Sequence, residues 1–142
     1  MHAIMSEARA MRYWSSLPHS TLAETERWMD SMIAVDPAIS DDFIVTLDGG
    51  LIGKLGAWKL PEVGFLLAPA HWGKGYASEG LAAFIERRRT LGSVELTADV
   101  DPRNLASLRL LERHGFAEIG RAAGTWQLGN ELCDSVYLRI EF

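Results

Sequence analysis

The chain has 142 residues, of which 48% are hydrophobic and 23% charged, and its formal net charge is -5. These values predict one globular domain over residues 1–142 with a continuous core. The acidic balance and the single basic run, Arg87–Arg89, argue against a nucleic-acid partner, and the only cysteine, Cys133, excludes both an intramolecular disulfide and a cysteine-based zinc site.

Targeting and membrane signals are also missing from the sequence. No apolar stretch approaches the ~18 residues that a membrane-spanning helix needs, and no apolar signal core follows an N-terminal charged segment. We therefore expect no membrane partner and a cytoplasmic location.

The first predicted elements are two short helices. Apolar residues recur at helical spacing over residues 6–17 and again over residues 20–35. Ser20 and Thr21 are candidate N-caps of the second helix, and Glu24 can complete a capping box. The predicted apolar stripe of this helix consists of Leu22, Trp28, Met29, Met32 and Ile33.

The pattern then changes to that of strands. Residues 42–60 form two aliphatic, β-branched runs joined by Asp48-Gly49-Gly50, which is typical of a hairpin because glycine accepts positive φ. After Pro61, the stretch EVGFLLAP predicts a third strand. Since it is nearly all apolar, we expect it to be buried on both faces.

The second half of the chain alternates between the two periods. We predict a helix over 74–91, a strand over 94–100, a helix over 104–116 closed by Gly115, and strands in FAEIGRA and DSVYLRIEF. This order predicts an α/β (α+β) fold with a mixed central sheet flanked by helices.

The stretch HWGKGYA joins the third strand to the long helix. The first amides of a helix have no intrahelical partner and lie at the positive end of its dipole, so they attract anions. Glycine at 73 and 75 lets an anion approach several amides, and pyrophosphate is a suitable guest. A tight connection without a ligand is the alternative. The loop lacks the pattern GxxxxGK(S/T), and Ser78 replaces the third glycine of GxGxxG, which disfavours nucleotide hydrolysis and nicotinamide binding.

Two motifs in this order resemble the Gcn5-related N-acetyltransferase (GNAT) family. HWGKGYASEG after EVGFLLAP is similar to the family loop (Q/R)xxGxG(A/G), although Ala70 stands at the Gln or Arg position. About one strand later, DPRNLASLRLLERHGF is similar to NxxSxxxLExxGF of the branch that acetylates ribosomal proteins and antibiotics. The resemblance covers roughly residues 6–142 and implies the acyl-CoA N-acyltransferase fold. The first family strand is expected to be missing, because only residues 1–5 precede the first helix.

The resemblance implies an N-acetyltransferase that moves the acetyl group of acetyl-CoA to a primary amine by direct attack in a ternary complex. The acceptor is a protein N-terminus, a small-molecule amine or an aminoglycoside, and no metal is implied. Acetyl-CoA would lie between two splayed parallel strands. Its pantetheine arm would pair with the backbone of Phe65, Leu66, Leu67 and Ala68, and its pyrophosphate would bind the amides of His71, Trp72, Gly73, Lys74, Gly75, Tyr76 and Ala77. The matching Asn104 would bond the arm, and it is also well placed to cap the next helix.

The reaction needs a deprotonated amine, a stabilised oxyanion and a proton for the departing thiolate. Alkyl amines have a pKa near ~10 and thiols near ~8.5, so the demands on base and acid are moderate. Many family members place a tyrosine acid where this chain has Leu111. We expect Ser107, one turn earlier, to donate a hydrogen bond to the sulfur, and Glu62 to act as base directly or through water. The oxyanion donor would be the amide of Leu66 or Leu67.

For three of these residues an ordinary structural role is the alternative. Ser107 also fits an ordinary helix serine, Glu62 an exposed strand-end carboxylate, and Lys74 a solvated loop lysine. The acceptor pocket would lie between the first helices and the last hairpin. Its aromatic candidates, which also fit a core, are Tyr13, Trp14, Trp28, Trp58, Trp126 and Tyr137.

Two other functions are compatible with the sequence. One is a non-catalytic acyl-CoA binder or sensor with the same fold, which Leu111 and Ala70 permit. The other is a partner-dependent structural subunit, whose open sheet edge is completed by another chain. The same open edge makes a homodimer possible.

Overall fold

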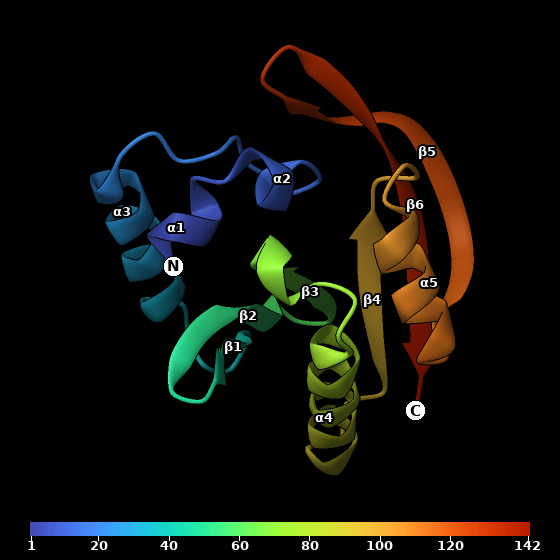
Figure 1. Ribbon diagram of the computed structural model, residues 1–142. Helices are drawn as coiled ribbons and strands as arrows, with labels where there is room; N and C mark the ends of the chain where they lie inside the picture. The colour runs from blue at the N-terminus through green and yellow to red at the C-terminus, as the bar shows by residue number, and fades with distance from the viewer.

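The computed structural model describes all of residues 1–142 and contains one sheet of six strands. The elements in chain order are α1 (His2–Met5), α2 (Ala8–Met11), α3 (Leu22–Ile33), β1 (Asp41–Leu47), β2 (Gly50–Lys59), β3 (Glu62–Leu67), the 3-10 turn η1 (Pro69–His71), α4 (Tyr76–Thr90), β4 (Glu95–Val100), α5 (Leu105–Arg113), β5 (Ala117–Leu128) and β6 (Glu131–Glu141). The strand order is β1-β2-β3-β4-β6-β5, with only β3 and β4 parallel (Figure 1). The predicted mixed α/β fold is confirmed, and no strand precedes α1.

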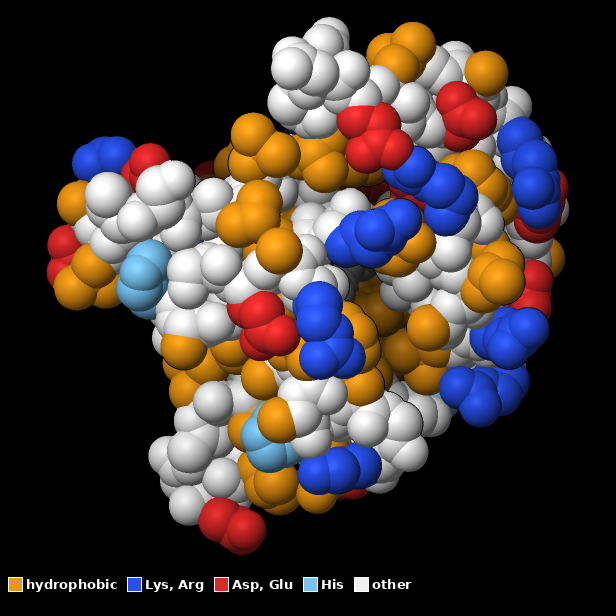
Figure 2. All heavy atoms as spheres, turned by 45° about the horizontal axis from the view of Figure 1, so that its top comes forward, with side chains coloured by type: hydrophobic (Ala, Val, Ile, Leu, Met, Phe, Trp, Pro, Cys, Tyr) orange, Lys and Arg blue, Asp and Glu red, His pale blue; other side chains and the backbone are white.

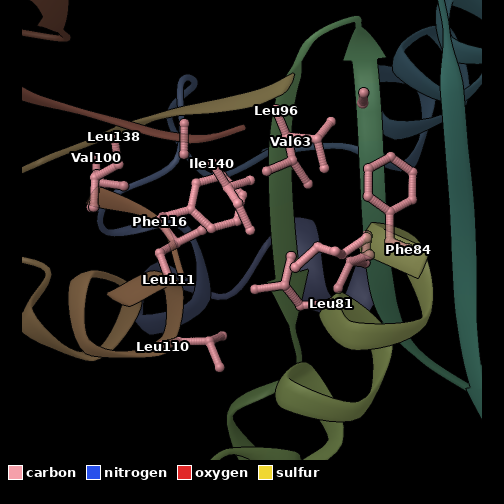
Figure 3. Close-up of a cluster of buried hydrophobic side chains, with 14 of the residues drawn as sticks. Val63, Leu81, Phe84, Leu96, Val100, Leu110, Leu111, Phe116, Leu138 and Ile140 are labelled. Atoms are coloured by element: carbon pink, nitrogen blue, oxygen red, sulfur yellow. The ribbon is translucent and has the colours of Figure 1, made fainter. Parts of the chain in front are cut away.

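The main core lies between the sheet and the helices α4 and α5. Helical spacing places Leu81, Phe84 and Ile85 on one side of α4, and all three are buried in this core. Figure 3 shows Leu81 and Phe84 extending from α4 toward the sheet. From α5 the core receives Leu110 and Leu111. Leu111 is 0% exposed, and burying such a side chain contributes about 1.5–3 kcal/mol. The Leu111 side chain therefore serves the packing of the core.

A smaller cluster covers the other face of β3. Ile4 and Met5 of α1 and Ala10 and Met11 of α2 pack against Leu66. The helix predicted over residues 6–17 is confirmed only over Ala8–Met11, and α1, which a turn separates from α2, was not predicted. The turn brings both short apolar pairs onto Leu66, so tertiary packing overrides the local helical pattern. No helix of this chain is long and apolar enough to cross a bilayer.

The helix α3 begins and caps as predicted. Thr21 and Glu24 form a complete capping box at its start. The predicted apolar stripe is only partly covered, since Leu22 and Ile33 are 55% and 76% exposed. The fully buried residue of α3 is instead Thr25, whose hydroxyl contacts two histidine rings.

Both hairpins have turns that their glycines permit. Asp48 and Gly49 connect β1 to β2 with φ of 50° and 80°, as the predicted tight turn requires. The β5–β6 hairpin is longer than predicted, because the stretch TWQLGNEL extends both strands up to a turn at Gly129. In Figure 1 this hairpin projects beyond the rest of the sheet.

The basic run on α4 is part of the fold. Arg87 and Arg88 both contact the carboxylate of Asp41 on β1 at 2.9 Å. Burial acts to raise the pKa of Asp41, but the hydrogen bonds and charges of the two arginines outweigh it and lower that pKa. Two of the three arginines thus fasten the end of α4 to β1.

The parallel strands β3 and β4 separate almost at once. Glu62 and Thr97 form their single register pair, and the Thr97 amide donates to the carbonyl of Pro61 at 3.0 Å. Beyond this pair the β4-facing edge of β3 has no strand partner. The expectation that β3 is buried on both faces therefore holds for Val63, Leu66 and Leu67 only, while Phe65 is half-buried beside the opening.

Candidate functional site

The loop between β3 and α4 leaves several amides without a partner. Gly73 and Gly75 have φ of 70° and 89°, where side chains are strained, and a Cβ on either would meet nothing within 4 Å. Thr21 and Glu24 cap α3 and Asn104 caps α5, but no side chain caps α4. The first amides of α4 have no acceptor within the chain. Open space above free amides fits an anion.

A cleft of about 1000 Å³ extends from this loop to α2 and α5. No aspartate or glutamate lines it, although the protein carries a formal net charge of -5. Figure 2 shows Lys and Arg side chains gathered around a hollow in the surface. The basic lining residues are Arg9, Arg12, Arg103, Arg109 and Arg113. Sequence reasoning missed them, because they come from separate segments with no local cluster; the four-residue spacing of Arg109 and Arg113 was the available signal.

The open edge of β3 forms one wall of the cleft. The Ala68 amide donates to the carbonyl of Ile52 on β2 at 2.8 Å. Since successive backbone groups point to opposite sides of a strand, the Leu67 amide points toward the cleft and the Leu66 amide toward β2. The Leu67 carbonyl accepts a bond from the indole of Trp72 at 2.8 Å, so Trp72 anchors the loop to β3.

Most of the residues expected around acetyl-CoA line this one cleft. The lining members are Phe65, Leu66, Leu67, His71, Trp72, Gly73, Gly75, Tyr76, Ala77, Asn104 and Ser107. Ala68 and Lys74 are not among them, and Lys74 is exposed. The side-chain oxygen of Asn104 accepts from the Ser107 amide at 3.2 Å, which is the predicted helix cap.

A second cavity of about 830 Å³ lies beside the first, under residues 13–15 and the β5–β6 hairpin. Its aromatic walls are Tyr13, Trp14, Trp58, Trp126 and Tyr137. Trp28 instead packs beside His19 and the Lys54 ammonium, outside the cavity. The residues that line both cavities are Tyr13, Trp14, Phe65, Asn104 and Ser107. The two spaces therefore meet along these five residues, Ser107 among them.

The second cavity contains two carboxylates without a cationic partner, Glu62 and Asp99. Partial desolvation raises the pKa of Glu62, and the negative charge of Asp99 raises it further. The other charged lining groups are Lys54, paired with Asp42 at 2.6 Å, Asp101, paired with Arg103, and Lys59. No three His, Cys, Asp or Glu side chains are grouped as metal ligands.

The fold is that of the acyl-CoA N-acyltransferases. The family model of the acetyltransferase (GNAT) domain matches residues 1–117. The chain therefore belongs to the GNAT acetyltransferase family, as the two motifs predicted.

Known relatives agree with this assignment. The uncharacterized N-acetyltransferase p20 of Bacillus licheniformis is 38% identical over 60 residues, which are 42% of this chain. The match spans about a third, 34%, of that relative's length.

Two solved structures share the fold over 99% of this chain and 86% of their own. Spermidine N-acetyltransferase from Vibrio cholerae, in complex with CoA and spermine, has a TM-score of 0.83 at 22% identity. An acetyltransferase from Salmonella typhimurium that modifies the N-terminal serine of a 50S ribosomal subunit protein has a TM-score of 0.88 at 15% identity. At such identities the likeness shows the fold.

Proposed function

We propose that residues 1–142 act as a single domain that transfers the acetyl group of acetyl-CoA to a primary amine by direct attack in a ternary complex. One observation carries the proposal: a cleft whose charged lining residues are all basic lies at a free helix N-terminus and adjoins, beside Ser107, a cavity with two unpaired carboxylates. The first space suits a polyanion, and the second suits a cation.

The chain offers a fitting group for each part of acetyl-CoA. The free amides at the start of α4 and the space above Gly73 and Gly75 fit the pyrophosphate. The open edge of β3, with the Leu67 amide, suits the pantetheine arm, and Asn104 is within the same cleft. When bound, acetyl-CoA supplies the acetyl group as a thioester.

Three residues have roles in the reaction. Glu62 takes the proton from the acceptor ammonium, directly or through water, and its raised pKa makes it a stronger base than an ordinary carboxylate. The Leu67 amide stabilises the oxyanion, and the Ser107 hydroxyl donates to the departing sulfur. Holding amine and thioester together is worth ~7 kcal/mol or more.

The acceptor is proposed to be a cationic amine. Glu62 and Asp99 attract an ammonium group, and the aromatic walls favour cations and apolar spacers. A neighbour of the same fold holds spermine, and another modifies a protein N-terminus. Both small-molecule and peptide amines therefore belong in a test panel, together with aminoglycosides.

A panel assay tests the proposed activity. Release of free thiol from acetyl-CoA should rise with at least one amine in a panel of diamines, aminoglycosides and peptides. The non-catalytic sensor is the competing function, because Leu111 lies in the core and the usual tyrosine acid is absent. Tight CoA binding with no thiol release for any amine would favour the sensor.

Ser107→Ala tests the proposed acid. We expect kcat to fall about 100-fold while CoA affinity stays nearly unchanged, because the hydroxyl acts on the departing sulfur. Ser107→Thr keeps a hydroxyl and should recover part of the rate, and Ser31→Ala on α3 is the control outside both cavities. Full turnover of the alanine variant would remove Ser107 from the mechanism.

Location and assembly stay predictions. The outer edge of β1 has no strand partner, and Phe43 and Ile44 on it are exposed. A homodimer that covers this edge should show a concentration-dependent mass in gel filtration. We also propose the cytoplasmic location that the sequence predicts.

A further inference from the structure

Three of the five arginines that line the cleft already have partners. Arg103 forms ion pairs with Asp101 and Glu131. The guanidinium groups of Arg9 and Arg12 lie 5.7 and 5.3 Å from the centres of aromatic rings. These three are therefore held by the protein itself.

Arg109 and Arg113 have no such partner. Neither forms an ion pair, a side-chain hydrogen bond or an aromatic contact, and both line the cleft. They stand four residues apart on α5, so their side chains are neighbours on one helix face. Like charges at this spacing destabilise a helix, and the helix dipole favours Arg113 in the last turn but gives no reason for Arg109. A dianion that neutralises both would explain the pair.

Arg113 lies at the end of α5 that is fastened beside the start of α4, and Arg109 lies one turn before it. The Ser78 hydroxyl, in the first turn of α4, is 2.7 Å from Nε2 of His114, the residue after Arg113. This bond fastens the last turn of α5 beside the free amides of α4. Ser107 is six residues before Arg113 on α5, about 9 Å along the helix axis. The helix thus spans from the reaction end of the cleft to its anion end.

We propose that Arg109 and Arg113 bind the 3′-phosphate of CoA and make the protein discriminate against 3′-dephospho-CoA. The inference rests on the proposed function. The amides of α4 serve the pyrophosphate, which leaves the 3′-phosphate as the one other anionic group of CoA. It is a terminal dianion, and planar guanidinium groups match its oxygens in pairs.

Calorimetric titration with CoA and with 3′-dephospho-CoA tests the proposal. The wild type should bind CoA at least about 10-fold more tightly than the dephospho compound. Arg109→Gln/Arg113→Gln should lose most of that preference: CoA affinity falls about 10-fold or more, and dephospho-CoA affinity stays within about twofold. The matched control is Arg27→Gln/Arg89→Gln, which removes the same charge outside the cleft and should keep the preference.

The other outcomes are distinguishable. Equal wild-type affinity for the two ligands overturns this inference and leaves the proposed function standing. Equal weakening of both ligands in the double variant also overturns it, because the arginines would then serve the shared pyrophosphate. No binding of either ligand to the folded protein, checked by thermal melting, overturns the proposed function as well.

Discussion

Gly75→Asp is expected to abolish CoA binding, with the dissociation constant raised at least about 100-fold. Gly75 has φ of 89° and is the N-cap of α4, and a side chain here enters the open space above the free amides. An aspartate carboxylate would occupy that space and repel a phosphate. Isothermal titration of the purified variant with CoA measures the loss.

Gly92→Asp is the matched control at the other end of α4. Gly92 has φ of 80° and likewise open space around its Cβ position, so both variants carry a similar backbone strain of about 1–2 kcal/mol. An acidic group is favourable at a helix N-terminus and unfavourable at its C-terminus. We therefore expect Gly92→Asp to melt at the lower temperature and still bind CoA normally. If Gly75→Asp bound CoA like the wild type, the loop would not be the phosphate site.

Glu62→Gln is expected to lower kcat/KM about 100-fold or more at neutral pH, because it removes the proposed base. In the wild type the rate should fall as pH drops through the raised pKa of Glu62, since only the carboxylate accepts a proton. The glutamine variant should lose this acidic limb of the pH profile. Asp99→Asn should move the limb to lower pH, because it removes a negative charge that raises the pKa of Glu62.

The melting temperature of Glu62→Gln distinguishes a site carboxylate, whose charge destabilises the fold, from a carboxylate that stabilises the structure. The folded pKa of Glu62 lies above its unfolded value, so its contribution to stability is lost as pH rises through the folded pKa. Glu62→Gln should therefore raise the melting temperature at pH 8 and leave it nearly unchanged at pH 4. Glu95→Gln, on β4 outside the cavity and near Arg139, is the control and should leave the pH profile intact. An unchanged acidic limb in Glu62→Gln would exclude it as the base.

Local features of the fold could be predicted where a few neighbouring residues decide the structure. Asp48-Gly49 makes a tight turn, Thr21 and Glu24 cap α3, and Asn104 caps α5. The helix predicted over residues 6–17 is much shorter in the structure, and α1 was not predicted, because the two short helices pack on Leu66 and this packing outweighs helical periodicity. Burial on a distant strand is not encoded in local spacing.

The candidate site likewise contains residues that the sequence could predict and residues that it could not. Most of the expected acetyl-CoA residues come from two short motifs, and the structure places them along one cleft. The arginines were missed because α2 and α5 approach the cleft from distant parts of the chain. Ser107 lines both cavities, while Leu111, one turn later on the same face of α5, is fully buried at the second cavity. This difference depends on how much of that face the folded chain covers.

The sequence by itself determined the family, through two short motifs, and also the glycine loop and the helix caps, because these depend on backbone angles and hydrogen bonds within a few residues. Only the tertiary structure decided that β3 and β4 part after the Glu62–Thr97 pair, and that Glu62 lies near Asp99. It also decided that five arginines share a cleft without acids. These properties arise from contacts between segments tens of residues apart, and their electrostatics depend on burial, which exists only in the folded chain.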